Sequence, residues 1–289
     1  MNEILVLGAS GLLGSELTSG KYLKKYKIIS ISRTSNTDYN VDLKDYDQVV
    51  KILELVKPKV IINLVGITNV DRCEQFPNEA YKLNVRTVEN LVDAIQLLSS
   101  KPFLVHISTD QVYDGDGFFL EKNINLSNYY AYSKYIGELK ASQTNSTILR
   151  TNFFGKSKTL KRSSLTDWLY SELKQKNNIN VFEDVWFNPI SIHNLCKMIE
   201  LTVEQKVEGT FNLGSNEGMN KADFAFHFAK TLNLSTSNMK RAKITDAKFL
   251  NAYRPKNMIM NLSKFENRFN VKLPKLTEEI KFVAKEYLE

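Results

Sequence analysis

Tyr130 and Lys134 are the residues of this sequence best placed to move a proton. They lie four apart in a segment whose pattern predicts a helix, so both side chains project from one helix face. A phenol has a reference pKa of about 10, which is too high for efficient proton transfer at neutral pH. An ammonium group roughly 5 Å away, at an effective dielectric of about 20, favours the phenolate by on the order of 3 kcal/mol. This pair could therefore exchange a proton near neutral pH.

A tyrosine four residues before a lysine is a weak signal by itself. With 13 Tyr in a Lys-rich chain, about one such pair is expected by chance, and a second pair does occur, Tyr170 and Lys174. Ser108-Thr109-Asp110 favours the first pair, because it ends a predicted strand, at the edge where parallel sheets bind ligands. The Thr109 hydroxyl could hold a substrate oxygen against Tyr130. We interpret the second pair as the chance match.

The elements that must position these residues follow from the apolar pattern. Short β-branched runs alternate with helical patterns through the first half of the chain, which is typical of a parallel sheet covered by helices. The predicted strands are residues 4–7, 27–32, 60–64, 103–108 and 147–150, and the predicted helices are residues 12–24, 45–56, 77–98 and 129–141. Pro77 suits the first turn of its helix.

The alternation loosens after Arg150, where we expect a second, smaller lobe. Here the pattern predicts a strand at 210–213 and helices at 165–176, 191–202, 221–232, 263–269 and 276–288. We therefore predict an α/β protein with a doubly wound parallel sheet. Residues 1–150 would form the main domain, with a return segment at about 178–213, and residues 151–177 and 214–289 would form a C-terminal α/β substrate lobe.

A glycine-rich string lies between the first predicted strand and the first helix. It reads Gly8-Ala9-Ser10-Gly11-Leu12-Leu13-Gly14. A helix end presents unpaired N–H groups, and glycines let a pyrophosphate approach the backbone closely. The string therefore predicts a Rossmann-like dinucleotide site. The alternative is a tight turn whose glycines serve only helix packing.

The end of the second predicted strand bears on the choice between nicotinamide cofactors. An acidic residue there accepts the ribose hydroxyls, whereas a basic residue faces a 2′-phosphate. The residues are Ser32-Arg33-Thr34, which favours NADP, with NADPH preferred over NADH. The alternative is that Arg33 is simply solvated. Further on, Asp42-Leu43 could border the adenine, or Asp42 could cap the next helix.

The string of glycines, Thr109 and the Tyr130–Lys134 pair together resemble the extended short-chain dehydrogenase/reductase superfamily, and within it the dTDP-4-dehydrorhamnose reductase family. Ser108-Thr109-Asp110-Gln111-Val112-Tyr113-Asp114-Gly115 is similar to that family's STDYVFDG string. Tyr130-Ala131-Tyr132-Ser133-Lys134 with Gly137-Glu138 is similar to its YGKTK-x-x-GE segment. Further similarities, over nearly the whole chain, are Asn63, Thr68, Val70-Asp71, Glu74, Pro77, Leu83-Asn84, Arg254-Pro255-Lys256-Asn257 and Leu273-Pro274.

The resemblance implies an NADP-dependent oxidoreductase that reduces the C4 keto group of a nucleotide-linked 6-deoxyhexose. The leading case is dTDP-4-dehydro-L-rhamnose reduced to dTDP-L-rhamnose, for polysaccharide biosynthesis. It implies that Tyr130 donates the proton, that Lys134 contacts the nicotinamide ribose, and that Thr109 assists at the carbonyl. It also implies cofactor contacts from Leu64, Val65 and Asn84, and substrate contacts from Thr68, Asp110, Val112, Phe153, Asn188 and Arg254.

Departures from the family pattern leave the exact sugar, nucleotide and product stereochemistry open. Asn152-Phe153-Phe154 replaces a family tryptophan, and Met258 stands where a serine follows Asn257. Sugar-nucleotide dehydratases carry a glutamate where this chain has Gln111, and an amide cannot act as a general base, so dehydration is disfavoured. The alternatives are another nucleotide-sugar reductase, an epimerase, or a non-catalytic NADP-binding subunit resembling the regulatory subunit of methionine adenosyltransferase.

The net charge and the cysteine and histidine content lead us to expect a cytoplasmic protein with a small-molecule ligand. The 39 Lys and Arg exceed the 32 Asp and Glu by 7, which suits a nucleotide but equally a plain solvated surface. One basic segment could either contact a substrate diphosphate or form a solvated loop; it contains Lys156, Lys158, Lys161 and Arg162. Two distant cysteines and three scattered histidines predict no disulfide framework and no metal site. We expect no nucleic-acid or membrane partner, and a homodimer is compatible with the family.

Overall fold

The computed structural model describes residues 2–33, 37–159 and 162–288. The chain divides into two compact units. The first unit comprises Met1–Thr109, Asn128–Arg150 and Cys196–Phe211, and the second comprises Asp110–Ser127, Thr151–Leu195 and Asn212–Glu289. Each unit has its own apolar core.

The first unit is built on a seven-stranded sheet with the order β11-β6-β5-β4-β1-β2-β3. Neighbours from β6 to β3 pair in parallel. The order turns back on itself between β1 and β4, which defines a doubly wound sheet. The predicted strands are confirmed, and β3 was not predicted. The strands are β1 (Glu3–Leu7), β2 (Lys27–Ser32), β3 (Tyr39–Asn40), β4 (Val60–Asn63), β5 (Phe103–Ile107), β6 (Ser146–Thr151) and β11 (Gly209–Leu213).

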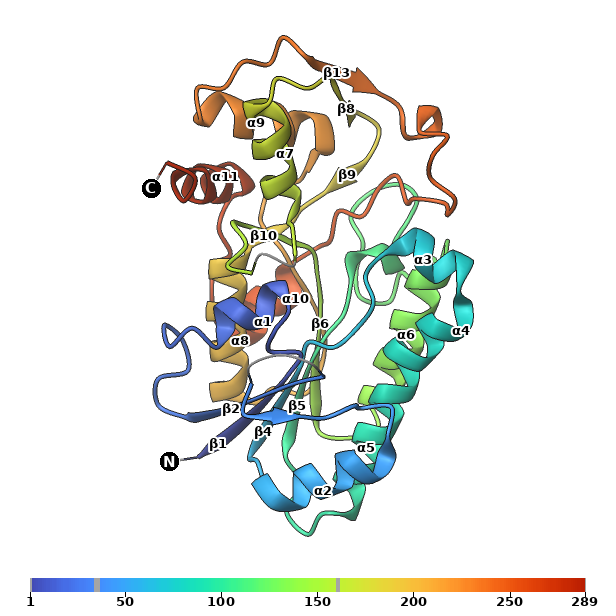
Figure 1. Cartoon of the computed structure of the whole chain (residues 1–289), viewed down its shortest axis with the longest axis vertical. Coiled ribbons are helices and arrows are strands. Elements are labelled where there is room, and N and C mark those ends of the chain that lie inside the picture. The colour runs from blue at the N-terminus through green and yellow to red at the C-terminus, as the bar shows by residue number, and fades with distance from the viewer. Residues whose placement is uncertain (1, 34–36, 160–161, 289) are drawn as a thin grey trace. The chain divides into compact units, whose positions relative to one another are not determined.

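Helices cover both faces of this sheet. In Figure 1, α2 (Tyr46–Val56), α5 (Thr87–Leu97) and α6 (Tyr129–Ala141) lie on one side of the sheet, and α1 (Leu12–Leu17) and α8 (Ile192–Gln205) lie on the other. Between α2 and α6 run α3 (Val70–Gln75), α4 (Pro77–Tyr81) and a π-helical turn, η1 (Lys82–Arg86). Pro77 opens α4 as predicted.

Two predicted helices differ from the observed ones. The first was expected to reach residue 24 but ends at Leu17, because Gly20 adopts a φ of +81° that turns the chain. Tyr22 and Leu23 are buried in that turn, so their apolar spacing did not signal a helix. The second, expected as one helix over 77–98, is interrupted by η1 where it meets α6. There, a Cβ on Gly137 would lie only 2.5 Å from the Asn84 carbonyl oxygen.

The second unit consists of short helices and two-stranded sheets. Phe224 is central to its core, since its ring lies 4.8 Å from that of Phe154 and 5.4 Å from that of Phe187. The helices are η2 (Asp110–Val112), α7 (Leu165–Lys174), α9 (Lys221–Thr231), η3 (Ile244–Asp246), α10 (Ser263–Phe269) and α11 (Leu276–Lys285). The strand pairs are β7 (Phe153–Phe154) with β10 (Ile190–Ser191), β9 (Trp186–Phe187) with β12 (Met219–Asn220), and β8 (Ile179–Phe182) with β13 (Met239–Ala242).

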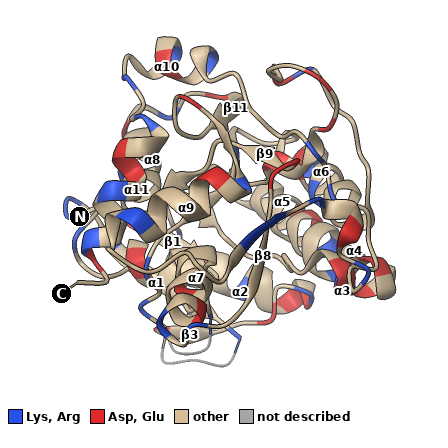
Figure 2. Ribbon diagram, turned by 90° about the horizontal axis from the view of Figure 1, so that it is seen from above, with Lys and Arg blue, Asp and Glu red and all other residues tan. Residues whose placement is uncertain are grey.

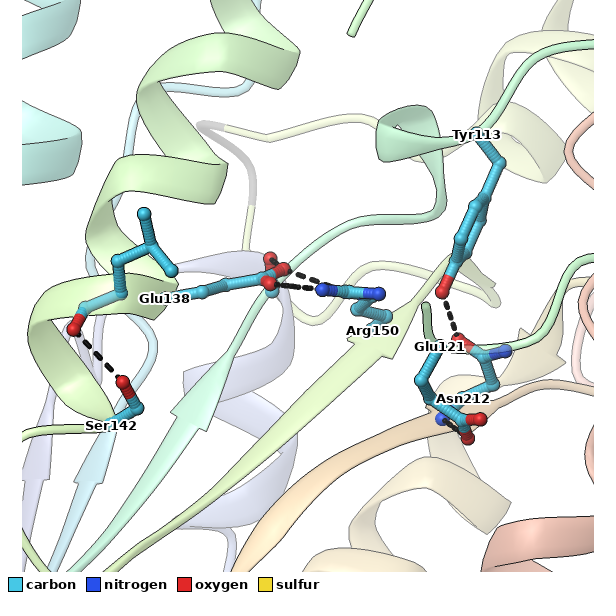
Figure 3. Close-up of polar contacts among 8 residues, drawn as sticks. Tyr113, Glu121, Glu138, Ser142, Arg150 and Asn212 are labelled. Atoms are coloured by element: carbon cyan, nitrogen blue, oxygen red, sulfur yellow. Dashed lines mark hydrogen bonds and ion pairs between the residues drawn. The ribbon is translucent and has the colours of Figure 1, made fainter. Parts of the chain in front are cut away.

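The unit boundaries differ from the predicted ones in two places. Asp110–Ser127 belongs to the second unit, and the return to the first unit begins at Cys196 rather than near residue 178. The Tyr113 hydroxyl donates to Asn212 Oδ1 over 2.7 Å, and the Asn212 N–H donates to the Glu121 carboxylate over 3.0 Å (Figure 3). These contacts join segments about a hundred residues apart, which a local sequence pattern does not encode.

Basic and acidic side chains are interspersed over the molecule. Figure 2 shows ribbon segments of both charge signs along α8 and α9. In the sequence, α8 contains Lys197 and Glu200, and α9 contains Lys221 and Asp223. Interspersed charges are typical of a solvated surface. In the part of the chain that the structure describes, no helix is both long enough and apolar enough to cross a membrane.

Candidate active site

The glycine-rich loop joins β1 to α1 at the carboxyl edge of the sheet. Gly8 has a φ of +83°, and the N–H groups of Gly8 and Ala9 both donate to the Ile31 carbonyl, over 2.9 and 3.1 Å. A Cβ on Gly14 would lie 2.4 Å from the Gly8 oxygen and 2.7 Å from the Ala9 Cα. Because both are backbone atoms, only glycine permits α1 to start this close to the loop.

This loop fits the pyrophosphate of a dinucleotide. Gly11 is the N-cap of α1, and no side chain in the described ranges caps that helix end. Backbone N–H groups are thus left to an anionic ligand, which the helix dipole also favours. The packing alternative explains Gly14 but does not explain why an N-cap position lacks a capping side chain. Ser10 is exposed beside it, while Leu12 is half-buried and Leu13 is buried.

The residues predicted to face the adenosine end lie at and beyond β2. Ser32 is buried and Arg33 is exposed where β2 ends, and Thr34 lies outside the described residues. Asp42 accepts from the Lys44 N–H and pairs with the Lys44 ammonium, both over 3.1 Å. The alternative role of Asp42 as a helix cap is wrong, because Asp45 caps α2 by accepting from the Gln48 N–H. Leu43 is buried in the core.

Asn84 holds the loop that follows β4. Its Oδ1 accepts from the Ile67 N–H over 2.8 Å, and its Nδ2 donates to the Ser133 hydroxyl over 2.9 Å. The structure thus gives this buried side chain a role in joining the loop to α6. Leu64 and Val65 line the start of the same loop and are half-buried, while Thr68 is exposed.

The predicted catalytic residues all lie in the first unit, on α6 and at the end of β5. The Asn128 side chain caps α6 by accepting from the Ala131 N–H, which fixes the first turn, where Tyr130 lies. Thr109 and Tyr130 are both buried. The Lys134 ammonium donates to the Ile107 carbonyl over 2.7 Å, two residues before Thr109. The helix and strand are therefore joined beside the predicted proton donor.

Burial sets the acid–base character of this site. The Lys134 side chain is 5% exposed, and burial lowers its pKa from 10.5 to about 8, while the charge of Glu138 opposes that shift. Lys134 can therefore exist in both protonation states near physiological pH. Such a shift at the edge of a sheet is typical of a functional group.

His106 is a polar neighbour of Lys134 and one of the three scattered histidines for which no metal site was predicted. It is fully buried on β5, and burial together with the charge of Lys134 holds its pKa well below the usual value. Its Nδ1 lies 3.2 Å from Asn63 Nδ2, and within the described ranges its Nε2 has no hydrogen-bond partner. A buried imidazole with these properties is neutral, so it adds no charge beside Lys134.

The second unit contains most of the predicted substrate residues. Asp110 is buried and accepts from Asn152 Nδ2 over 2.8 Å, and Arg254 donates to the Ala252 carbonyl over 2.9 Å. Asn188 is 2% exposed, and its amide bonds both backbone groups of Met260, so its side chain has a packing role. Val112 is buried and Phe153 is half-buried.

Lys221 is a charged residue that the sequence analysis did not select. It is half-buried at the first position of α9, and its ammonium lies 5.8 Å from the centre of the Phe187 ring. Burial lowers its pKa, an effect that the charge of Asp110 opposes and the charge of Arg254 reinforces. Two cations and one carboxylate therefore influence one another in the second unit. In the sequence Lys221 was only the start of a helix.

The basic loop after β7 is partly occupied by internal contacts. The Lys156 ammonium donates to the Glu286 carbonyl and lies 5.6 Å from the centre of the Tyr287 ring. Lys158 and Arg162 are exposed, and Lys161 lies outside the described residues. Among the residues that the structure describes, no three His, Cys, Asp or Glu side chains are grouped to hold a metal ion.

The doubly wound sheet, the glycine-rich loop and the Thr109, Tyr130 and Lys134 constellation define an extended short-chain dehydrogenase/reductase. The chain belongs to the RmlD substrate binding domain family, which matches residues 1–289.

The relatives include proteins named for different roles. A dTDP-4-dehydrorhamnose reductase of Shigella flexneri is 28% identical, over 94% of this chain and 93% of its own. Subunit beta of methionine adenosyltransferase 2 of Rattus norvegicus is 27% identical, over 91% of this chain and 81% of its own. The solved dTDP-4-dehydrorhamnose reductase of Bacillus anthracis, in complex with NADP, has a TM-score of 0.89 at 24% identity, covering 99% of this chain and 100% of its own.

Proposed function

We propose that this protein is an NADPH-dependent reductase of the C4 keto group of a nucleotide-linked 6-deoxyhexose, with dTDP-4-dehydro-L-rhamnose as its substrate and dTDP-L-rhamnose as its product. The observation that carries the proposal is the buried ammonium of Lys134. This residue lies on the same helix as Tyr130 and donates a hydrogen bond to the Ile107 carbonyl at the end of β5. A purely structural helix–strand contact does not need a buried cation, because an apolar side chain fills the same space at lower cost.

Each catalytic residue has a chemical task in this reaction. Bound NADPH would supply a hydride to the carbonyl carbon. The Tyr130 hydroxyl donates its proton to the carbonyl oxygen, so the keto group becomes an alcohol and Tyr130 is left as a phenolate. The Lys134 ammonium stabilises that phenolate, and Thr109 holds the carbonyl oxygen toward Tyr130. Reprotonation of Tyr130 from solvent restores the site.

The preference for the phosphorylated cofactor rests on Arg33. It is exposed where β2 ends, and the neighbouring described residue, Ser32, is not acidic. A cation there favours a 2′-phosphate, and a carboxylate would favour a free ribose hydroxyl. The NADP complex of the Bacillus anthracis relative supports the same choice.

The sugar nucleotide would be recognised through its negative charge. Lys221 and Arg254 are the cations that the second unit brings under mutual electrostatic influence, and we assign them to the diphosphate of the substrate. A diphosphate relieves the repulsion between two neighbouring cations, which is a gain that a neutral sugar cannot provide.

The test is a spectrophotometric assay. Purified protein is mixed with NADPH and freshly generated dTDP-4-keto-6-deoxyhexoses of both C5 configurations, and the decay of NADPH absorbance is followed, with NADH as the cofactor control. We expect rapid decay with NADPH and the L-configured sugar, and an NMR spectrum of the product that shows the rhamno configuration. Saturable NADPH binding without decay for any keto-sugar would contradict the proposal.

A second candidate is a non-catalytic NADP-binding subunit of another enzyme. The observation that favours it is the similarity to methionine adenosyltransferase 2 subunit beta over 91% of this chain. Co-expression with the catalytic methionine adenosyltransferase of the same source tests it. A stable complex whose activity depends on this chain, together with no turnover of any keto-sugar, would favour this candidate over the reductase.

A further inference from the structure

A buried ion pair lies one helical turn beyond Lys134. Glu138 on α6 is 2% exposed and Arg150 on β6 is 3% exposed. Arg150 Nε lies 3.0 Å from each carboxylate oxygen of Glu138, and the terminal Nη2 lies 2.6 Å from Oε2. Figure 3 shows the two groups facing each other from the helix and the strand.

Ser108 connects this ion pair to the predicted catalytic strand end. Its hydroxyl donates to the same Glu138 carboxylate, and its N–H donates to the Leu149 carbonyl over 2.7 Å. Ser108 directly precedes Thr109. One carboxylate therefore joins the helix that carries Tyr130 and Lys134, the strand end that carries Thr109, and the neighbouring strand β6.

Stability alone is a poor explanation for this arrangement. Removing two charges from water costs several kcal/mol per ion, and replacing a buried pair by apolar side chains of similar volume is often neutral or stabilising. Glu89, which is half-buried and pairs with Arg86 and Lys140 over 3.4 Å each, shows that a carboxylate of this unit can pair at the surface. The burial of Glu138 therefore calls for a role that depends on its charge and position.

The surroundings of Lys134 identify that role. On its own helix, Lys134 faces Tyr130 and the charge of Glu138, which favours the ammonium form. From β5 it faces the neutral His106 and the Ile107 carbonyl, and from β6 Arg150 compensates the charge of Glu138. Gly66 and the uncharged Asn84 adjoin it from the loop after β4 and from η1. Glu138 is thus the anion among the described groups that supports the Lys134 charge.

We propose that Glu138 is a positioning residue of the reductase, which orients Thr109 through Ser108 and sustains the ammonium form of Lys134 through its own charge. It acts through these two residues and does not touch the substrate. The effect of Glu138 on catalysis rests on the proposed function. Its effect on the protonation of Lys134 does not, because that effect exists in the protein without substrate.

The decisive experiment measures the titration of Lys134 directly. The ¹³Cε resonance of Lys134 in protein labelled with ¹³C-lysine is assigned by its absence from Lys134→Met and followed with pH. Glu138→Gln removes a negative charge and should shift the Lys134 titration to lower pH, whereas Arg150→Met removes a positive charge and should shift it to higher pH. Glu89→Gln is the matched control and should leave the titration unchanged.

A merely structural ion pair would give a different pattern. Both variants would then lower the melting temperature without opposite shifts of the Lys134 titration, and that result would overturn the proposal. If either single variant fails to fold, the double variant Glu138→Gln/Arg150→Met leaves no unpaired buried charge. It should fold and titrate at lower pH than the wild type, because Glu138, one turn away on the same helix, influences Lys134 more strongly than Arg150 on β6 does. An unchanged titration in the double variant would overturn the proposal equally.

The positioning through Ser108 has its own variant. Ser108→Ala leaves the ion pair intact and should lower kcat about tenfold, with the KM for NADPH unchanged. A kcat equal to that of the wild type would refute this part. Because the NMR titration needs no turnover, a wild-type protein that reduces no keto-sugar but shows the opposite shifts would contradict the proposed function and leave the electrostatic role of Glu138 standing.

Discussion

The two tyrosine–lysine pairs of this chain have the same spacing and different surroundings. On α6 in the first unit, the Lys134 ammonium is buried against the Ile107 carbonyl. On α7 in the second unit, Lys174 is exposed and lies 5.5 Å from the centre of the Tyr170 ring, which in turn packs 4.9 Å from the Tyr287 ring. In the first pair the lysine contacts the end of a parallel strand, and in the second it covers the surface of its own tyrosine.

The difference teaches what a helical spacing can and cannot specify. Residues four apart share a helix face in either case, and both lysines can approach their tyrosines. Burial and the partner of the ammonium decide whether the lysine acquires a shifted pKa, and burial lowers that of Lys134 to about 8. The α7 pair is therefore a matched internal control for every experiment on the α6 pair.

Removing the two tyrosine hydroxyls separately should give the largest contrast. We expect Tyr130→Phe to lower kcat by roughly a thousandfold or more, because the proposed general acid is lost, while the Kd for NADPH changes less than about twofold. Tyr170→Phe should retain wild-type kcat. Steady-state assays with titration of NADPH fluorescence measure both quantities. A Tyr130→Phe variant with full activity would remove the distinction between the two pairs.

Removing the two lysine charges should give the second-largest contrast. Lys134→Met should lower kcat on the order of a hundredfold, because the phenolate of Tyr130 loses its stabilising cation. Lys174→Met should be neutral. In the wild type, the ammonium form exists below the pKa of about 8 and is lost as the pH rises through it, so kcat should fall on the alkaline side. A pH profile that is flat from 7 to 9.5 would be inconsistent with this role.

A third prediction compares two lysines of the second unit, Lys221 and Lys230, which lie on the same helix. Lys221→Met should raise the KM for the nucleotide sugar about tenfold, because one of the two cations proposed to bind the diphosphate is lost, with the Kd for NADPH unchanged. Lys230→Met, an exposed lysine on the same helix, is the matched control. Equal effects of the two variants would show that only the general positive charge matters, and not the place of Lys221.

The pH dependence of stability should show the smallest effect. Between pH 8 and 10.5 the unfolded chain binds more protons at Lys134 than the folded chain, because the folded-state pKa is the lower one. This group therefore makes the fold more stable as the pH rises, by about 1 kcal/mol from pH 8 to 9. The free energy of unfolding of the wild type, measured with denaturant at pH 8 and pH 9, should increase relative to that of Lys134→Met by this amount.

The sequence by itself determined what depends on neighbours along the chain. Runs such as Val60–Asn63 alternate with helical segments, and this predicted the parallel sheet, because each element buries its own apolar face. The loop at residues 8–14 was predictable because Gly14 meets the backbone of Gly8 and Ala9 within seven residues, and Gly8 adopts a φ of +83° that favours glycine. The helix with Tyr130 and Lys134 was predicted with its observed bounds.

Only the tertiary structure decided what depends on contacts between distant segments. Lys134 reaches a carbonyl 27 residues away, and Tyr113 reaches Asn212 across 99 residues, which places Asp110–Ser127 in the second unit. No local pattern distinguishes Lys221 from other lysines at helix starts, since its shifted pKa comes from burial and from the charges of Asp110 and Arg254. Spacing along the chain thus fixes which side chains share a face, and the pKa of each depends on the burial and charges that the fold brings to it.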